Sequence, residues 1–344
     1  MKAFYGAGIK FGIDIGSFRI RICSGENIIL EEASCAAVDD ETGEIAGFGT
    51  DALIRIHSAQ TGNCHLVWTI KNGIMTDYEI TKEMLRYFIN KATKKSVSRP
   101  NVMISIPCGL GSVVKHALID AARHAGVQNV SLIASPAAAA IGVGQVIDLP
   151  DTVLSVVIGE NMTDCGMYAC GGTVYEKRAS FGSHTVDLEI CKFLEKKHHL
   201  MIIPEQAEQL KSEWASAVRG GEEKITVRGR RKEDGVEIIV EVGEHELEAV
   251  IQKAIMPVVK LIKDMFCYLT PEMADDLIHN GLLLTGDSMQ LANFSEWISK
   301  QIGIPVFIPK EPENVVAIGC YKAIDRVGDL SLLVSRGDEY YGGF

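Results

Sequence analysis

A strand–turn–strand pattern recurs at the head of each half of this chain of 344 residues. The first copy, residues 11–22 (FGIDIGSFRIRI), is an apolar strand, a turn at Gly16 and Ser17, and a second strand. The second copy, residues 153–168 (VLSVVIGENMTDCGMY), has the same order, with its turn at residues 159–162. Each copy precedes a further apolar strand and, later, an amphipathic helix that leads to another apolar strand. This recurrence predicts an internal duplication, with one α/β domain in each half.

Strands and helices alternate between and after these hairpins, which predicts sheets that carry helices on their faces. In the first half we expect strands at residues 101–107 and 130–134, and helices at residues 80–91, 112–125 and 136–143. In the second half we expect strands at residues 237–242 and 281–285, and helices at residues 186–197, 205–217 and 244–267. Thr81 is in position to cap the helix at residues 80–91.

The duplication divides the chain into two α/β domains with a cleft between them. Domain I is predicted to span residues 1–147, and residues 319–344 return to it. Domain II is predicted to span residues 148–318. Residues 32–66 and 183–249 interrupt the two domains, and each segment is expected to form a small inserted subdomain.

Charge and composition limit the kinds of partner that suit this chain. A net charge of −11 and a pI near 5.4 argue against a surface that binds nucleic acid. One basic run, Lys224 to Lys232, has acidic neighbours on both sides and is predicted to be a solvated hairpin loop. The nine cysteines form no CxxC pair, which favours free thiols in a reducing cytoplasm.

Neither a secretory signal nor a transmembrane helix is predicted. The N-terminus has no sustained apolar segment. Residues 126–147 carry no charge, but their Gln, Asn, Ser and Pro residues favour a strand, a turn and a buried Ala-rich helix over a membrane span. We therefore expect a cytoplasmic protein.

The glycine turns are where the chemistry is expected. A hairpin with such a turn presents backbone N–H groups that can cradle phosphate oxygens, and two hairpins facing across a cleft would hold a nucleotide from both sides. Asp14, just before the first turn, is placed to hold Mg²⁺ through water. A third glycine turn, residues 284–288 (LTGDS), follows a buried strand. Taken alone, each turn is equally consistent with an ordinary connection at the end of a core strand.

Several longer motifs resemble the MreB branch of the actin superfamily, from Gly12 to about Arg326. The most specific are FGIDIGS at the first hairpin, residues 71–92 (KNGIMTDYEITKEMLRYFINKA) and residues 104–126 (ISIPCGLGSVVKHALIDAARHAG). Others are PAAAAIG (136–142), AEQLKSEWASA (207–217), LTPEMADDLIHNGLLLTG (269–286) and ENVVAIGCYKAID (313–325). Their order and spacing match this family, and the small first insertion suits it better than a heat-shock chaperone ATPase or a sugar kinase.

The resemblance implies an actin-like fold of two duplicated, ribonuclease-H-like α/β domains. It also implies ATP or ADP with Mg²⁺ in the central cleft, and assembly into paired protofilaments beneath the membrane. Carried over position by position, it assigns these residues to the nucleotide site: Asp14, Gly16 and Ser17 in the first phosphate loop; Glu208, Lys211 and Glu213 on the helix beside ribose and adenine; and the adenosine loop from Gly286 to Met289.

The chain departs from the family's pattern at this same site. The family's second phosphate loop is roughly DIGGGTTE, and VIGENMTD stands here. Val157 replaces the metal-associated Asp, and Glu160 and Asn161 follow the one retained glycine, Gly159. The family's IEEP, whose first Glu positions the attacking water, is IASP here, with Ala134 at that position.

The other two loops differ as well. Phe18 and Arg19 stand where the family's first loop has small or polar residues. The family's adenosine loop is LTGGG, and Asp287 and Ser288 replace two of its glycines. A carboxylate near phosphates without a bridging metal costs about 1–4 kcal/mol at 4 Å, for an effective dielectric between 80 and 20. Arg19 is expected to offset this by pairing with phosphate or with Glu160.

These departures predict weak or absent ATP hydrolysis. Hydrolysis needs a group that orients water in line with the γ-phosphate and a metal that spreads the developing charge. Ala134 cannot do the first, and Val157 cannot help with the second. The catalytic positions are therefore not intact.

Three functions remain open at this point. The first is a cytoskeletal cell-shape protein that forms filaments with itself or with an active MreB paralogue, alongside other morphogenesis proteins. The second is a working ATPase in which Asp164 or Glu160 replaces the missing carboxylates. The third is a monomeric actin-fold scaffold.

Membrane contact is expected to be weak and peripheral, at the inner face of the membrane. The family binds membrane through an exposed apolar pair in a loop or an amphipathic N-terminus. The corresponding loop, residues 94–100 (KKSVSRP), is basic and has only Val97 as an apolar side chain, and the N-terminus offers only Phe4 and Tyr5. Stable interfacial anchoring needs more apolar area than this.

Overall fold

The core of the molecule is two sheets with the same spatial order of strands. The structure is a computed structural model that describes residues 8–58, 63–94, 98–214, 224–287 and 293–338, without the side chains of residues 213 and 214. The first sheet has the order β19 (Val334–Arg336), β10 (Asn129–Ala134), β9 (Asn101–Ile106), β1 (Lys10–Ile15), β2 (Arg19–Ser24), β3 (Asn27–Ala33). The second has the order β18 (Val306–Phe307), β17 (Leu282–Thr285), β11 (Val153–Ile158), β12 (Thr163–Ala169), β13 (Gly172–Ala179).

Both predicted hairpins are present, and they close in the same way. The Gly16 N–H donates to the Arg19 carbonyl at 2.8 Å, and the Gly159 N–H donates to the Met162 carbonyl at 2.9 Å. In each sheet the first hairpin strand also pairs in parallel with a strand from later in the chain, β9 or β17. Leaving aside the extra edge strand β19, the two sheets are copies of one arrangement, which confirms the predicted duplicated α/β fold class.

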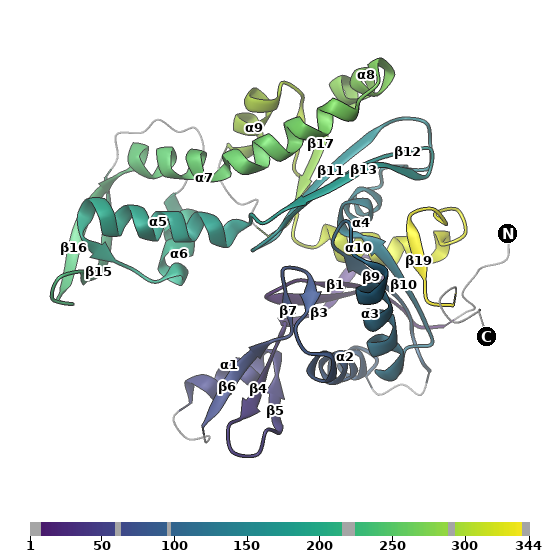
Figure 1. The fold of residues 1–344 in the computed structure, drawn as a ribbon, viewed down its shortest axis with the longest axis horizontal. Helices are drawn as coiled ribbons and strands as arrows, with labels where there is room; N and C mark the ends of the chain where they lie inside the picture. The colour runs from purple at the N-terminus through teal and green to yellow at the C-terminus, as the bar shows by residue number, and fades with distance from the viewer. Residues whose placement is uncertain (1–7, 59–62, 95–97, 215–223, 288–292, 339–344) are drawn as a thin grey trace.

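Two short helices join the sheets. α4 (Ser135–Gly142) and α10 (Val315–Ala323) cross so closely that a Cβ at Gly319 would lie 1.7 Å from the Ala138 carbonyl oxygen, and one at Gly142 would lie 2.2 Å from the Val315 carbonyl oxygen. One hydrophobic cluster contains both helices together with residues of each sheet, including Ile133 of the first. We call the first sheet with its attached elements the first lobe, and the second sheet with its elements the second lobe (Figure 1).

Other helices pack on the sheets within each lobe. In the first lobe these are α2 (Tyr78–Ala92) and α3 (Ser112–His124), which share a hydrophobic cluster with β1 and β2. In the second lobe these are α7 (Glu244–Met265), α8 (Pro271–Asn280) and α9 (Phe294–Ile302). The described chain also contains two short strands, β7 (Ile70–Lys71) and β8 (Ile74–Met75), and two short 3-10 helices, η1 (Phe266–Tyr268) and η2 (Ile324–Arg326).

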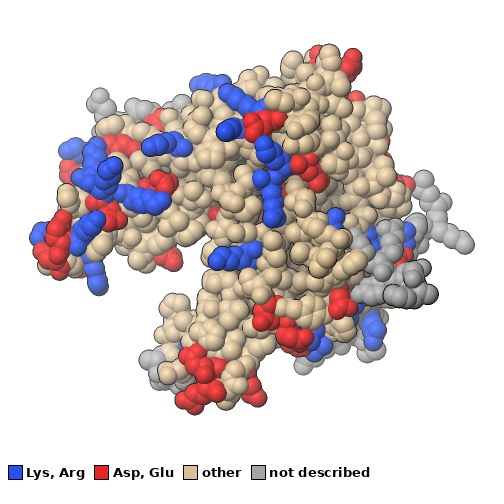
Figure 2. Space-filling model, in the orientation of Figure 1, with Lys and Arg blue, Asp and Glu red and all other residues tan. Residues whose placement is uncertain are grey.

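Each lobe carries an arm, and the two arms project to the same side of the molecule (Figure 1). The arm of the first lobe contains β4 (Cys35–Asp39), β5 (Ile45–Phe48), α1 (Gly49–His57) and β6 (Cys64–Trp68). The arm of the second lobe contains α5 (Ser183–His198), β14 (Leu200–Met201), α6 (Pro204–Trp214), β15 (Lys224–Arg231) and β16 (Glu237–Gly243). Figure 2 shows that the surface is deeply hollowed between the arms.

Two local predictions were wrong. Thr81 does not cap α2, because the helix begins at Tyr78 and the Asp77 carboxylate accepts the Ile80 N–H at 2.9 Å. Thr81 is instead buried inside the first turns. The basic run that was predicted to be a loop forms strand β15, which pairs along its length with β16.

The basic side chains of this run are neutralised locally. Lys224 pairs with Glu241 at 2.9 Å and Arg231 with Asp234 at 2.9 Å. Lys232 reaches Glu195 at 2.6 Å. Blue and red side chains accordingly alternate on this arm in Figure 2, which is unlike the uniform basic surface that binds a polyanion.

The uncharged segment at residues 126–147 folds as predicted, with strand β10 followed by the buried helix α4. Within the described ranges, no helix combines the length and the apolar character needed to cross a bilayer. All nine cysteines are free thiols, and Cys170 and Cys267 are exposed rather than buried.

Candidate functional site

Two adjoining cavities lie where the hairpin turns of the two lobes meet. The larger has a volume of about 310 Å³ and the smaller about 100 Å³. Residues that line both cavities are Arg19, Arg21, Glu160, Asp287 and Glu313. The two spaces are therefore parts of one cleft, with walls from both sheets and from α6.

Asp14 lies one residue before the end of β1, at the wall of the smaller cavity. The Ser105 hydroxyl of neighbouring β9 donates to its carboxylate at 2.5 Å. Burial raises the pKa of Asp14, and the Ser105 hydrogen bond and the charge of Arg21 oppose that rise. Because Asp14 and Arg21 are partners in the β1–β2 ladder, the two side chains emerge on the same face of the hairpin.

The second hairpin has a different pair at the corresponding place. Val157 of β11 lies opposite Asp164 of β12, so this carboxylate has an apolar cross-strand partner. Asp164 instead accepts the backbone N–H of Cys108, in the loop after β9 of the first lobe, at 2.7 Å. Burial, opposed by this hydrogen bond and by Arg178, raises the pKa of Asp164 to about 6.

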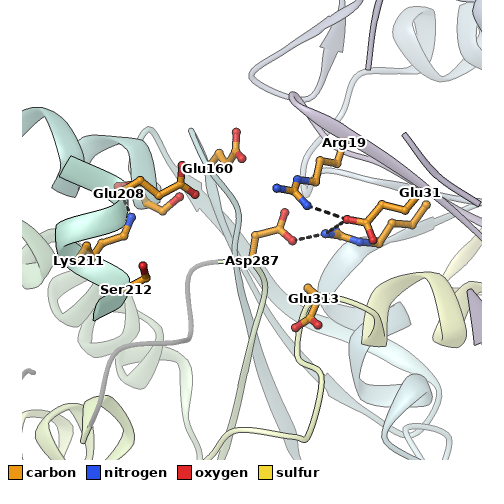
Figure 3. A pocket seen from close by; sticks show the side chains of 10 residues that line it. Arg19, Glu31, Glu160, Glu208, Lys211, Ser212, Asp287 and Glu313 are labelled. Carbon is orange, nitrogen blue, oxygen red and sulfur yellow. Dashed lines mark hydrogen bonds and ion pairs between the residues drawn. The ribbon is translucent and has the colours of Figure 1, made fainter. Parts of the chain in front are cut away.

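Arginines from the first lobe meet carboxylates in the larger cavity (Figure 3). Arg19 pairs with Glu31 of β3 at 2.8 Å. Arg21 pairs with the same carboxylate at 3.1 Å and with Asp287 at 2.7 Å. Arg19 thus pairs with Glu31 and not with Glu160, because Glu31 lies directly across the β2–β3 ladder from Arg21 and reaches both guanidinium groups. The other expected partner of Arg19, a phosphate, stays a prediction.

Helix α6 forms the opposite wall of the larger cavity. Lys211 pairs with Asp187 of α5 at 2.7 Å, and both side chains are buried. Its ammonium also lies 3.5 Å from the Ser183 carbonyl oxygen. Figure 3 shows Glu208 and Ser212 on the same helix beside Lys211. Among the described residues, the basic side chains that line this cavity are Arg19, Arg21 and Lys211, and each is already ion-paired within the protein.

Glu160 sits at the second turn between the two cavities. Burial raises its pKa to about 7, with further contributions from the nearby charges of Asp287 and Glu208. Arg19 and Lys211 oppose the rise. Glu160 is thus partly protonated near neutral pH, chiefly because it is buried and also because Asp287 and Glu208 lie nearby.

The structure brings most of the predicted site residues together. The smaller cavity is lined by Asp14, Gly16, Ser17, Phe18, Arg19, Val157, Gly159, Glu160, Asn161, Gly286 and Asp287. The larger cavity adds Glu208 and Lys211. Ala134 packs against the cluster between the sheets, and the next residue, Ser135, lines the smaller cavity. The side chain of Glu213, together with Ser288 and Met289, lies outside the described residues.

Sequence reasoning missed the central arginine. Arg21 is almost completely buried, with 4% of its side chain exposed, and it contacts carboxylates from both lobes. Its signal was present in the alternation of β2, where Arg19 and Arg21 are two residues apart and so share a face. Glu31, Ser105 and Glu313 were also missed, because each lies on a strand or loop that reaches the cleft only after the sheets form.

Comparison with known proteins places the chain in a family. Residues 8–331 match the family model described as MreB/Mbl protein. The cell shape-determining protein Mbl of Bacillus subtilis is 29% identical over 322 residues, which cover 93% of this chain and 96% of that relative. The cell shape-determining protein MreB of Escherichia coli is 30% identical over 330 residues, with 92% and 95% covered.

Solved structures agree on the fold. MreB5 of Spiroplasma citri bound to ADP has a TM-score of 0.84 at 21% identity, covering 95% of this chain and 98% of that one. A MamK double helical filament has a TM-score of 0.77 at 15% identity, covering 91% and 98%. The duplicated sheets, the crossing helices between them and the match of the family model over nearly the whole length lead to one assignment: the chain has the actin-like fold and belongs to the MreB/Mbl protein family.

Proposed function

We propose that this chain is a cell-shape cytoskeletal subunit that assembles into filaments, alone or with an active MreB paralogue, and has weak or absent ATP hydrolysis. Family membership over residues 8–331 supports the cytoskeletal role. The two relatives above are cell shape-determining proteins, and MamK of similar fold forms a double helical filament. We also propose that the protein lies in the cytoplasm, at the inner face of the membrane.

Weak hydrolysis is supported mainly by the state of the basic groups in the cleft. A triphosphate needs cations that are free to contact it, and here Arg19, Arg21 and Lys211 are held by Glu31, Asp287 and Asp187. A metal-bound triphosphate must therefore displace these carboxylates before it can contact the basic groups at the phosphate end of the cleft, which disfavours its binding there.

The nucleoside end of the cleft keeps a larger share of the residues that the family resemblance assigns to it than the phosphate end does. Glu208, Lys211 and Ser212 line the larger cavity from α6. MreB5 of Spiroplasma citri has been solved with ADP and with AMPPNP. We therefore propose that ATP or ADP binds weakly in this cleft and is not turned over. We also propose the division into domain I (residues 1–147, with 319–344) and domain II (residues 148–318).

A working ATPase is the second candidate, because Asp164 lines the smaller cavity directly across the ladder from Val157. With a pKa of about 6, this carboxylate is mostly ionised at neutral pH. Its engagement with the Cys108 N–H argues for a structural role instead. The two candidates predict opposite results in one assay.

The test measures phosphate release and sedimentation on the same purified sample with ATP and Mg²⁺. We expect pelleted filaments with phosphate release at the level of a protein-free control. Asp164→Asn and Glu160→Gln should leave that background unchanged. Turnover equal to that of an active MreB, abolished in either variant, would establish the ATPase instead. Protein that never pellets, alone or with a paralogue, would favour the monomeric scaffold.

Membrane contact remains a weaker part of the proposal. Phe4, Tyr5 and Val97, which carried that expectation, lie outside the described residues. Co-sedimentation with anionic lipid vesicles should recover only a small fraction of the protein, because the apolar side chains available at these two places are few.

A further inference from the structure

One ion pair crosses the cleft between the lobes. Arg21 comes from β2 of the first sheet, and Asp287 follows β17 of the second. Their nitrogen and oxygen atoms are 2.7 Å apart. Figure 3 shows the Asp287 carboxylate extending from the second lobe towards the arginines and Glu31 of the first.

The pair belongs to a chain of alternating charges. Arg19, Glu31, Arg21 and Asp287 follow one another at 2.8, 3.1 and 2.7 Å, so two positive and two negative groups balance. The Arg21 side chain is 4% exposed and that of Asp287 is 29% exposed. Arg21 therefore has two carboxylate partners, and without Asp287 only Glu31 would balance its buried charge, which is unfavourable.

The backbone holds Asp287 where it can reach Arg21. Gly286 has φ of +118°, and a Cβ there would lie 2.1 Å from the Ile158 carbonyl oxygen, so the chain passes directly over the end of β11. The Thr285 hydroxyl donates to the Pro312 carbonyl at 2.5 Å and fixes the other side of this turn. The two residues before Asp287 are therefore held in place beside the second hairpin.

We propose that Asp287 is a built-in anion that occupies Arg21 in place of a ligand phosphate and ties the two lobes together, so that the cleft closes without a nucleotide. In this view Asp287 also sets the ligand preference of the cleft, because a polyanion must displace it to reach Arg21. The inference goes beyond the proposed function, and it holds whether or not ATP is hydrolysed.

The first test measures closure in the absence of nucleotide. Small-angle scattering on the monomer peak from size exclusion gives the radius of gyration of the wild type, Asp287→Asn and Asp264→Asn. Asp264 is the matched control, because it pairs with Lys177 at 2.8 Å within the second lobe. We expect a larger radius for Asp287→Asn only. A radius equal to that of the wild type would overturn the proposal.

Salt and a conservative variant sharpen this test. At 1 M salt, where the Debye length is about 3 Å, the wild type should expand towards the radius of Asp287→Asn, and that variant should change little. Asp287→Glu keeps the charge and should stay compact. If it expanded as much as Asp287→Asn, the charge would not be the cause and the inference would fail.

The second test measures affinity for ADP by calorimetry. Removing one carboxylate about 4 Å from a phosphate charge should tighten binding roughly fivefold or more. Asp287→Asn is expected to gain this affinity, and Asp264→Asn to match the wild type. An Asp287→Asn protein that binds ADP no better than the wild type would contradict the role in ligand preference. Phosphate release, which tests the proposed function, is a separate measurement.

Discussion

The two hairpins share a backbone and differ in their charges. Counting back from the turn glycines, Gly12 and Asp14 of β1 correspond to Ser155 and Val157 of β11. Counting forward, Arg21 of β2 corresponds to Asp164 of β12. The first hairpin thus carries a carboxylate facing a guanidinium, and the second carries a valine facing a carboxylate.

One charged group of each hairpin makes a contact with the other lobe. Arg21 of the first hairpin reaches Asp287 of the second lobe, and Asp164 of the second hairpin accepts the Cys108 N–H of the first. Arg21 and Asp164 occupy equivalent positions beside the cleft, and each makes a contact between the lobes. The comparison therefore supports a cleft whose two walls are joined by side chains of the protein itself.

The largest contrast is expected at the strand positions four residues before each turn. A Cβ on Gly12 would lie 2.2 Å from the Ala317 carbonyl oxygen in α10, so Gly12→Ala should lower the free energy of unfolding by about 3 kcal/mol or more. Ser155 already has a side chain, and its buried hydroxyl has no hydrogen-bond partner among the described residues.

Ser155→Ala should therefore change stability by less than about 1 kcal/mol, in the stabilising direction. Urea denaturation of both variants measures the contrast. Equal destabilisation at the two sites would show that α10 does not approach β1 more closely than α4 approaches β11.

A pH-dependent effect of intermediate size is expected at Asp164. Its pKa rises from 3.8 in the unfolded chain to about 6 in the fold, so the native state binds the extra proton between these values. This contribution to stability is complete below about pH 4 and is lost as pH rises through about 6. Asp164→Asn can still accept the Cys108 N–H and has no charge to bury.

The variant should therefore match the wild type near pH 4 and be more stable above pH 7, by about 1–3 kcal/mol. Urea midpoints of both proteins at pH 5, 6, 7 and 8 give the difference, and other titrating groups cancel in it. A constant difference across this range would show that Asp164 does not titrate there.

The smallest contrast is expected at the turn glycines. A Cβ would lie 2.9 Å from the Arg19 carbonyl oxygen at Gly16, but 3.3 Å from the Met162 carbonyl oxygen at Gly159. Gly16→Ala should cost about 1 kcal/mol, because backbone must move. Gly159→Ala should lie within about 0.5 kcal/mol of the wild type, because lost chain entropy in the unfolded state offsets the tight contact. Thermal unfolding of the two variants measures this order. A Gly159→Ala protein less stable than Gly16→Ala would show that these Cβ contacts do not decide the cost.

Local patterns were enough to predict both hairpins with their turns, the central strands of the two sheets and most helices. Alternating and continuous apolar runs depend on residues two to four apart, and these spacings decide which face of an element is buried. The cap was assigned to Thr81 and not to Asp77 because Asp and Thr are both good caps and these two lie only four residues apart. The strand at residues 224–231 was missed because its charged residues suit a loop as well as an exposed sheet.

The sequence by itself determined the duplicated fold and the chemical character of the cleft, since both follow from short-range spacing and from residue types at the turns. Only the tertiary structure decided which charges meet. Arg21 and Asp287 are 266 positions apart in the chain, and Asp164 is 56 positions from Cys108. Electrostatic partners depend on distances of a few ångströms, which no local pattern specifies before the two sheets have packed on α4 and α10.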